Sequence, residues 1–320
     1  MNSSPFITRN KPSGNSNKKG NLLMKILNRN FAGYLIANAM IKLGYTKRAK
    51  QKLLNGNYII CLCFHTPSKN LFESCVNWLS KNGFQFISMK DLEKISKGEL
   101  DFPKGAVIIT ADDGWQTNYE SIVPVAVKNK TPVTIFLNPG IVENGDAYWW
   151  SYVSAANRQK IINQSAEYYK GLENEERVQK INEIAGQVKL KREALTIEQV
   201  KELSNTDLIS MQSHTISHPI LPKCSDEKSA NEITGAKKII EGWTAKPVTH
   251  FAYPNGDYTQ REMTTLANNG YTMAFTTNQR YITPGDLKQP YTLPRLLILE
   301  DASFEENICR MMGVWKKKRK

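Results

Sequence analysis

From residue 58 onward, short β-branched or aromatic runs alternate with helix-favouring stretches, and this alternation restricts the fold more than any other feature of the chain. Strand and helix segments in this succession are typical of βα units that build a parallel sheet. The pattern therefore predicts an α/β fold, a distorted (β/α) barrel of seven or eight parallel strands. The candidate strands are residues 58–64, 84–88, 106–111, 132–137, 208–213, 248–253, 271–276 and 293–298.

One gap between predicted strands is far longer than the others. Residues 150–205 are polar, charged and helix-favouring, so we expect a helical insertion over the barrel mouth. Its last helix has a clear start, because Thr196 and Gln199 fit a capping box, and Leu195 and Val200 fit a hydrophobic staple. We assign the barrel with this insertion to residues 56–315.

The positive charge of the chain is concentrated at its two ends. Residues 1–55 contain eleven Lys or Arg and no acid, and residues 316–320 form a basic tail of five more. Removing these sixteen charges from the net charge of +13 leaves −3 for the stretch between them. Proteins that bind nucleic acid present a basic folded face, so we expect no nucleic-acid partner here.

The N-terminal region divides into two predicted parts. Residues 1–20 are too polar to order themselves, so a disordered tail is expected. Residues 21–55 predict a basic amphipathic helical segment, since Asn38 and Lys42 interrupt its apolar run and a spanning helix needs about 20 apolar residues. Two interpretations remain open: the segment lies on an anionic membrane surface, or it packs on the barrel itself.

The cysteines and the N-terminus bear on the cellular location. The five cysteines include no CxxC pair and no regular spacing, which indicates buried thiols in a reducing compartment. No small-residue cleavage site of a signal peptide is evident. We therefore expect a cytoplasmic protein, or one peripheral on the cytoplasmic membrane face, rather than a periplasmic or exported one.

Two adjacent carboxylates follow the third predicted strand. The run 107–110 leads directly into Asp112, Asp113 and Gly114. In a parallel barrel, side chains at the carboxyl ends of strands line the mouth, where active sites are built. Adjacent carboxylates repel each other, so a cation that separates their roles would stabilise them. The alternative is a turn that Asp and Gly merely shape.

Two of the four histidines follow the fifth predicted strand. His214 and His218 are four residues apart, and both imidazoles would lie on one side if the chain turned into a helix there. Together with one Asp they supply two nitrogen ligands, one oxygen ligand and an open position, with a spare carboxylate beside them. This set predicts a divalent metal site, with Zn²⁺ favoured and Co²⁺ or Ni²⁺ as alternatives.

These two clusters carry a resemblance to a known family. Residues 110–114 read Thr-Ala-Asp-Asp-Gly and residues 214–218 read His-Thr-Ile-Ser-His. They resemble the Thr-Phe-Asp-Asp-Gly and His-Ser/Thr-x-x-His motifs of the polysaccharide deacetylase family, also called NodB homology proteins or family 4 carbohydrate esterases. Residues 252–256, Ala-Tyr-Pro-Asn-Gly, are similar to its third motif, usually Arg-x-Pro-Tyr-Gly.

The resemblance implies a function and residue roles. The substrate would be an N-acetylated sugar in a polysaccharide or lipid-linked glycan, and the enzyme a hydrolase of carbon–nitrogen bonds other than peptide bonds. By motif position, Asp113, His214 and His218 would bind the metal and Asp112 would be the base. The third motif, with Tyr253, Pro254 and Asn255, would contact the substrate and supply a backbone donor to the oxyanion.

The chain departs from the family pattern in two places. Residues 293–297 read Leu-Pro-Arg-Leu-Leu and lack the late acid histidine. His65, at the end of the first strand, resembles the early histidine of a branch that includes poly-N-acetylglucosamine deacetylases, so we assign it as the acid. Ala252 replaces the motif arginine that orients the base, and Arg295 could replace it by another route. His250 is early in its strand and is read as structural.

Several aromatic residues near strand ends could stack on sugar faces, although each could equally be packing. The candidates are Trp115, Tyr148, Trp149, Trp150, Tyr253 and Tyr258. Trp115 and the cluster 148–150 are favoured, because they follow strands on the active-site face. Two alternative functions remain open. One is an exported deacetylase acting on peptidoglycan or on O-acetyl esters, and the other is a carbohydrate-binding homologue without turnover, because the late His and the motif Arg are absent.

Overall fold

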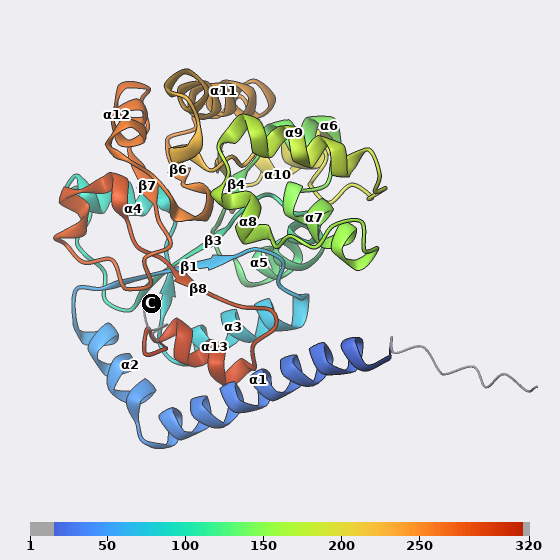
Figure 1. Cartoon of the computed structure of the whole chain (residues 1–320). Helices are drawn as coiled ribbons and strands as arrows, with labels where there is room; N and C mark the ends of the chain where they lie inside the picture. The colour runs from blue at the N-terminus through green and yellow to red at the C-terminus, as the bar shows by residue number, and fades with distance from the viewer. Residues whose placement is uncertain (1–15, 316–320) are drawn as a thin grey trace, which may run out of the picture.

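The structure is a computed structural model that describes residues 16–315, with side chains from residue 29 onward. It contains all eight predicted strands, most of them shorter than the sequence runs, and Figure 1 shows them gathered at the centre of the molecule. The strands are β1 (Ile59–Phe64), β2 (Gln85–Phe86), β3 (Ala106–Ala111), β4 (Val133–Leu137), β5 (Ile209–Ser213), β6 (His250–Ala252), β7 (Met273–Phe275) and β8 (Leu296–Leu297).

The strands form one sheet in the order β7-β6-β5-β4-β3-β1-β8, and β2 pairs with the start of β3. Every pairing between these strands is parallel. A parallel bridge between Phe275 of β7 and Leu293, shortly before β8, brings the two ends of the sheet together. The predicted fold class, a distorted (β/α) barrel, is therefore confirmed.

Alternate residues of the strands pack into two hydrophobic cores. In β4, Ile135 and Leu137 pack toward the surrounding helices, whereas Phe136 lies with Phe275 inside the barrel. All six residues of β1 are buried, as expected for a parallel strand that is covered on both faces. Since all strands run the same way, the residues that follow β1, β3, β5 and β6 meet at one rim.

Helices surround the barrel in most of the predicted places. The capping box of the last insertion helix is present, because Gln199 N donates to Thr196 Oγ1 at 3.2 Å and Thr196 N donates to Gln199 Oε1 at 2.9 Å. The helices of the barrel are α3 (Lys69–Lys81), α4 (Met89–Ser96), α5 (Val123–Asn129), α6 (Pro139–Asn144), α11 (Asp226–Thr244), α12 (Gln260–Asn268) and α13 (Phe304–Met311).

Four helices between β4 and β5 occupy the range predicted for the insertion: α7 (Trp149–Arg158), α8 (Ala166–Gly171), α9 (Asn174–Ala185) and α10 (Ile197–Ser204). The first three enclose a small core of their own that includes Val153, Ile181 and Ile184, whereas α10 packs into the main core through Val200 and Leu203. Two backbone hydrogen bonds join the end of the insertion to the loop after β3, Gln116 N to Glu193 O at 2.6 Å and Leu195 N to Gly114 O at 2.9 Å. The insertion therefore contacts the loop that carries the paired carboxylates.

The N-terminal segment forms α1 (Ser16–Lys42) and α2 (Tyr45–Asn55). Helix α1 lies along α13 (Figure 1), with Gly33 and Ala37 buried and Arg29 paired with Asp301 at 3.0 Å. The helix begins inside the range predicted to be a disordered tail, so that boundary was wrong, because adding turns to a formed helix costs little. The rest of that tail, residues 1–15, and the basic tail 316–320 lie outside the described residues.

The outer face of α1 is apolar and exposed. Phe31, Leu35 and Ile36 are 62%, 51% and 54% exposed, and Leu43, directly after the helix, is 65% exposed. Within the part of the chain that the structure describes, none of the helices combines the length and apolarity that a membrane crossing requires. Packing on the barrel therefore accounts for one face of α1 and leaves apolar side chains on the opposite face more than half exposed.

Candidate active site

The paired carboxylates lie where β3 ends, as predicted. Asp113 adopts a left-handed conformation with φ 73°, and Gly114 follows with φ 77°. A Cβ on Gly114 would come within 2.5 Å of Leu137 Cδ2, so only glycine fits at this turn. Positive φ costs energy for a residue with a side chain, and here it turns the Asp113 carboxylate away from Asp112 and toward the end of β5.

The two histidines come together without a helix. After β5 the chain forms a tight loop in which Thr215 and His218 have φ values of 68° and 54°, and the imidazole centroids are 4.9 Å apart. The predicted helical turn was wrong, because Thr215 Oγ1 accepts from His218 N at 3.1 Å and closes the loop instead. Asn138, at the end of β4, donates to the carbonyl oxygens of His214 and Thr215 and holds the loop against the sheet.

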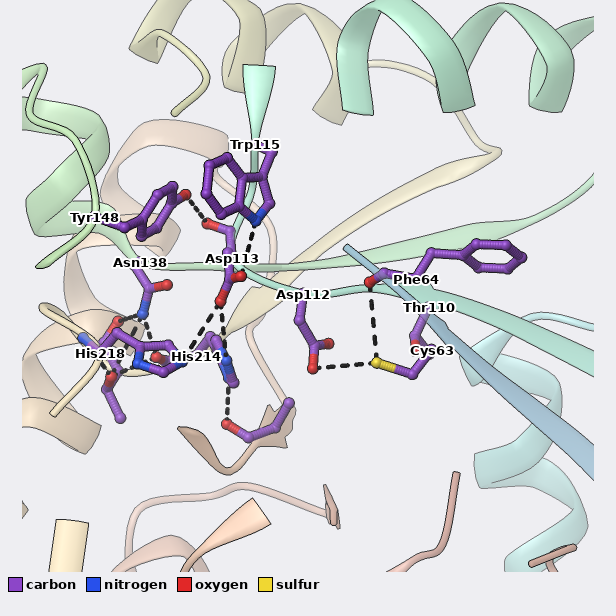
Figure 2. A network of polar contacts seen from close by, with 12 residues as sticks. Cys63, Phe64, Thr110, Asp112, Asp113, Trp115, Asn138, Tyr148, His214 and His218 are labelled. Atoms are coloured by element: carbon purple, nitrogen blue, oxygen red, sulfur yellow. Dashed lines mark hydrogen bonds and ion pairs between the residues drawn. The ribbon is translucent and has the colours of Figure 1, made fainter. Parts of the chain in front are cut away.

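Asp113, His214 and His218 converge on one point (Figure 2). Asp113 Oδ1 is 3.4 Å from His214 Nε2 and 3.6 Å from His218 Nε2, and all three side chains are almost fully buried. This oxygen has no hydrogen-bond partner among the described residues, and a buried carboxylate oxygen without a partner is costly. The three ligand atoms lie within 4.8 Å of one another, so the group fits a divalent cation.

The electrostatics of these residues agree with a metal site. Burial lowers the pKa of His218 to about 3, which leaves the neutral imidazole that a metal ligand must be. Burial opposes ionisation of Asp113, but the imidazole of His214, with Nε2 3.4 Å from Oδ1, outweighs it and keeps the pKa of Asp113 well below its usual value. The second ring nitrogen of His214, Nδ1, is 2.7 Å from the carbonyl oxygen of Ala252, which fixes the ring so that Nε2 points inward.

Asp112 points the other way and is bound by Arg295. The guanidinium contacts both carboxylate oxygens, with Nη1–Oδ1 at 2.6 Å and Nη2–Oδ2 at 2.7 Å. Burial would raise the pKa of Asp112, but the charge of Arg295 outweighs burial and keeps the pKa below its usual value. Arg295 therefore lies where the missing motif arginine would be needed, beside the predicted base.

His65 lies next to Asp112, as the sequence predicts. Donor atoms of Cys63, His65 and Asp112 lie within 4.8 Å of one another, and Asn118 Nδ2 donates to the His65 carbonyl at 2.6 Å. A second cation does not fit this group, because Arg295 already neutralises Asp112. In addition, burial raises the pKa of the Cys63 thiol well above its usual value, and metal ligation needs the thiolate. The group instead combines an ionised carboxylate with a half-buried imidazole.

The third motif lies beside the candidate metal ligands, but not all of its side chains are exposed to a substrate. Tyr253 is fully buried and stacks on Tyr258, with ring centroids 4.7 Å apart, so the prediction that its ring contacts the substrate was wrong. The ring faces the core between sheet and helices because residues of β6 alternate, and Ala252 takes the inward position. Pro254 is also buried, whereas Asn255 is partly exposed at φ 56° and its side-chain Nδ2 has no partner among the described residues.

Trp115 and the aromatic residues 148–150, which were predicted to stack on sugars, form one cluster beside the candidate metal ligands. Trp115 and Tyr148 have ring centroids 4.1 Å apart, Tyr148 stacks on Trp150 at 4.8 Å, and the Trp150 ring lies edge-on to His218 at 4.6 Å. Tyr148 is fully buried and Trp149 nearly so, which removes both from direct sugar contact. Trp115 and Trp150 are half-buried and remain accessible.

A cavity of about 330 Å³ lies at the opposite end of the barrel and includes none of the candidate ligands. His250 borders it and pairs with Glu93 of α4, with Nε2–Oε1 at 3.1 Å. Thr272 Oγ1 also donates to Glu93 Oε1, at 2.5 Å. His250 therefore lies away from the rim, which agrees with its predicted structural role.

Sequence reasoning missed two residues of the site. Asn138 had no motif to identify it, although a polar residue directly after a buried strand is the same signal that marked Asp112. Cys63 was interpreted only as a small buried residue, yet its Sγ is 3.4 Å from Asp112 Oδ2. Cys63 lies two residues before His65, the candidate general acid. Because alternate residues of an extended chain share a face, this spacing could have indicated that the Cys63 thiol also faces the rim.

Comparisons with known proteins agree with this geometry. The sequence profile of the polysaccharide deacetylase family matches residues 99–274, which include both Asp and both His of the site but not His65 or Arg295. A poly-β-1,6-N-acetyl-D-glucosamine N-deacetylase of Staphylococcus aureus is 25% identical over 297 residues, covering 88% of this chain and 85% of that protein.

Two further proteins are similar. YxkH of Bacillus subtilis is 25% identical over 209 residues, and this match covers 65% of the chain but only 58% of the length of YxkH. The structure of the Streptococcus pyogenes deacetylase PplD in complex with acetate has the same fold, with a TM-score of 0.60 at 20% identity over 80% of this chain and 98% of that one. Since the family profile spans more than half of the sequence and contains the assembled site, the chain belongs to the polysaccharide deacetylase family of hydrolases.

Proposed function

We propose that this protein is a metal-dependent deacetylase that hydrolyses the acetamide of an N-acetylated sugar in a polysaccharide. One observation carries the proposal: the imidazoles of His214 and His218 converge on Asp113 Oδ1, a buried oxygen without a hydrogen-bond partner among the described residues. The carboxylate of Asp112, which Arg295 binds, lies beside this group. The name of the Staphylococcus aureus relative supports an N-acetylglucosamine polymer as the substrate class.

The proposed cofactor is a divalent cation held by Asp113, His214 and His218. Two imidazole nitrogens and one carboxylate oxygen form a ligand set that Zn²⁺ accepts in catalytic sites, and Co²⁺ or Ni²⁺ are alternatives. When bound, such an ion lowers the pKa of water and polarises a carbonyl group. Side chains of the protein carry out the remaining steps.

In the proposed reaction, Asp112 accepts a proton from the water that attacks the acetyl carbonyl. Arg295 holds this carboxylate ionised and in one orientation, which keeps it ready to accept the proton. The oxyanion that forms needs a donor, and the backbone N–H of Asn255 in the third motif is the candidate. Collapse of the adduct breaks the carbon–nitrogen bond and requires protonation of the leaving amine.

His65 is the proposed donor of that proton. Its imidazole is half-buried, on the Asp112 side of the site, within 4.8 Å of the carboxylate. A deacetylase needs such an acid, because an amide nitrogen leaves poorly without a proton. The position of His65 therefore favours turnover over a binding role without catalysis.

Metal analysis and acetate release from N-acetylglucosamine oligomers test the proposal together. We expect metal in the wild type and in Asp112→Asn, release by the wild type, and a decrease of about 10²- to 10⁴-fold in Asp112→Asn. His214→Ala should lose both metal and release. A wild type that retains metal but releases no acetate would support a carbohydrate-binding homologue, and release from O-acetyl esters alone would support the esterase alternative.

We also propose that α1 attaches the protein to the anionic cytoplasmic face of the membrane, where a lipid-linked glycan would be the substrate. The support is the combination of exposed apolar side chains, including Phe31, Leu35 and Leu43, with a basic segment that contains no acid through residue 55. An amphipathic helix of this kind inserts its apolar face between headgroups, while its basic residues attract anionic lipid.

Flotation with anionic liposomes tests the membrane proposal. We expect the wild type to float and a triple variant, Phe31→Ser, Leu35→Ser and Leu43→Ser, to remain at the bottom, because these side chains are exposed and do not hold the fold. The matched control replaces exposed apolar residues elsewhere, Leu100→Ser and Val127→Ser, and should float. Equal flotation of the triple variant would exclude α1 as the contact.

A further inference from the structure

The two oxygens of the Asp113 carboxylate have different environments. Trp115 donates its indole N–H to Asp113 Oδ2 at 2.8 Å, and Figure 2 shows this bond on the side of the carboxylate away from the histidines. Oδ1 is left facing both imidazoles, at 3.4 and 3.6 Å. A hydrogen bond to an ionised acceptor is strong and directional, so this bond defines which oxygen is presented to the cation.

The indole is itself held in place on several sides. Its ring packs on Tyr148, whose hydroxyl donates to the backbone carbonyl of Asp113 at 2.9 Å. The backbone of Trp115 forms an antiparallel bridge with Ala194, at the end of the helical insertion. Ring and backbone are therefore fixed by different parts of the fold, and a rotation of the indole would break its hydrogen bond to Asp113 and its packing on Tyr148.

Each of the three metal ligands has a different support. The Ala252 carbonyl holds His214 through Nδ1, whereas Nδ1 of His218 has no hydrogen-bond partner among the described residues and its ring packs against Trp150. For Asp113 the support is the indole of Trp115. Partners that hold metal ligands in this way typically contribute about 10- to 100-fold to metal affinity.

We infer that Trp115 is a positioning residue that fixes Asp113 for metal binding through Oδ1. The inference rests on the proposed metal dependence. It gives Trp115 a role other than the sugar stacking suggested by its position in the sequence, and it makes the helical insertion part of the metal site. Without the indole N–H, Oδ2 is released, and the carboxylate can rotate away from the imidazoles or offer both oxygens to the ion.

The test compares the metal affinity of the full-length wild type with that of Trp115→Phe, which keeps an aromatic ring on Tyr148 but removes the donor. Competition with a chromogenic chelator gives the dissociation constants of Zn²⁺ and Co²⁺. We expect affinity to fall by about 10- to 100-fold, with a changed Co²⁺ absorption spectrum. The melting temperature of metal-free Trp115→Phe should stay close to that of the metal-free wild type. If Trp115 had only a structural role, this temperature would fall.

The matched control is Trp78→Phe in α3, a half-buried tryptophan that stacks on Phe84 away from the site and should leave affinity unchanged. If the wild type binds metal and Trp115→Phe binds it equally well with the same Co²⁺ spectrum, the positioning role is overturned and the proposed function stands. If the wild type binds no metal, the proposed function fails and this inference fails with it.

Discussion

Arg295 binds both carboxylate oxygens of Asp112, although the two residues are separated by most of the barrel sequence. The pair is almost completely buried, with side chains 1% and 4% exposed. The guanidinium also bonds to Thr110 Oγ1 at 3.1 Å and to the Thr276 carbonyl at 3.2 Å, so four contacts fix its plane. The orientation of the proposed base is thus set by a residue that lies outside the three family motifs.

Loss of this arginine should destabilise the protein. Arg295→Met leaves the Asp112 charge buried without a partner, and breaking a buried pair in this way costs about 3–5 kcal/mol. Urea unfolding of the variants would measure the loss. The double variant with Asp112→Asn should recover part of it, because the uncompensated charge is gone.

The control for this measurement is an exposed ion pair. Arg29 pairs with Asp301 at 3.0 Å, and the two side chains are 61% and 55% exposed, so Arg29→Met should cost no more than about 1 kcal/mol. An Arg295→Met protein as stable as the wild type would contradict the buried-charge argument.

The role proposed for His65 depends on the leaving group. His65→Gln should slow acetate release from an N-acetylated sugar by about 10²- to 10⁴-fold, because the amine must be protonated as it leaves. A p-nitrophenyl acetate substrate has a good leaving group and should be affected much less. His250→Gln, at the other end of the barrel, should hydrolyse both substrates at close to wild-type rates. Equal losses on the amide and the ester would exclude His65 as the general acid.

The fold and the convergence of the candidate metal ligands could be predicted because the signals are local. A parallel barrel places the residues after every strand at one rim, so Asp113 and His214 could be predicted to meet once β3 and β5 were identified. The loop that joins His214 to His218 could not be predicted, because spacing alone favours a helical turn. The actual turn depends on positive φ at Thr215 and on the Thr215 hydroxyl.

The direction in which side chains point was the second feature that the sequence did not predict. Tyr253 was expected at the mouth because it follows a strand, but a shift of one residue reverses the face, and the ring lies in the outer core. Trp115 was expected to face the substrate, whereas its N–H points at Asp113. Such contacts depend on packing between segments far apart in the chain, here the β3 loop and the insertion, which no local pattern encodes.

Glu93 should make the stability of the barrel depend on acid pH. The imidazole of His250, with Nε2 3.1 Å from Glu93 Oε1, is the main cause that lowers the pKa of Glu93 to about 2. A folded-state pKa below the unfolded value near 4.3 means that the stabilisation is complete above about pH 5 and is lost as the pH falls toward 2. Glu93→Gln should therefore cost on the order of 2 kcal/mol at pH 7 and little at pH 2.

Urea unfolding at several pH values measures this difference, and exposed Glu99→Gln is the control that should show no such dependence. Because the two proteins are compared at each pH, titration of other carboxylates cancels. If the difference in unfolding free energy between the wild type and Glu93→Gln stays constant from pH 7 to pH 2, the Glu93–His250 pair is not its source.

Gly114 should tolerate no side chain, because its conformation and its surroundings both exclude one. Gly114→Ala places a Cβ 2.5 Å from Leu137 Cδ2 at φ 77°, so we expect a loss of about 1–3 kcal/mol and weaker metal binding, since the strain falls on the neighbouring Asp113. Gly242→Ala is the matched control, because that glycine lies within α11 with nothing within 4 Å of its added Cβ. The control should gain about 0.4–1 kcal/mol, because alanine restricts the unfolded chain and favours helix. Thermal unfolding together with chelator competition checks both effects, and a Gly114→Ala protein that matches the wild type in each would show that the turn can relax without moving the ligand.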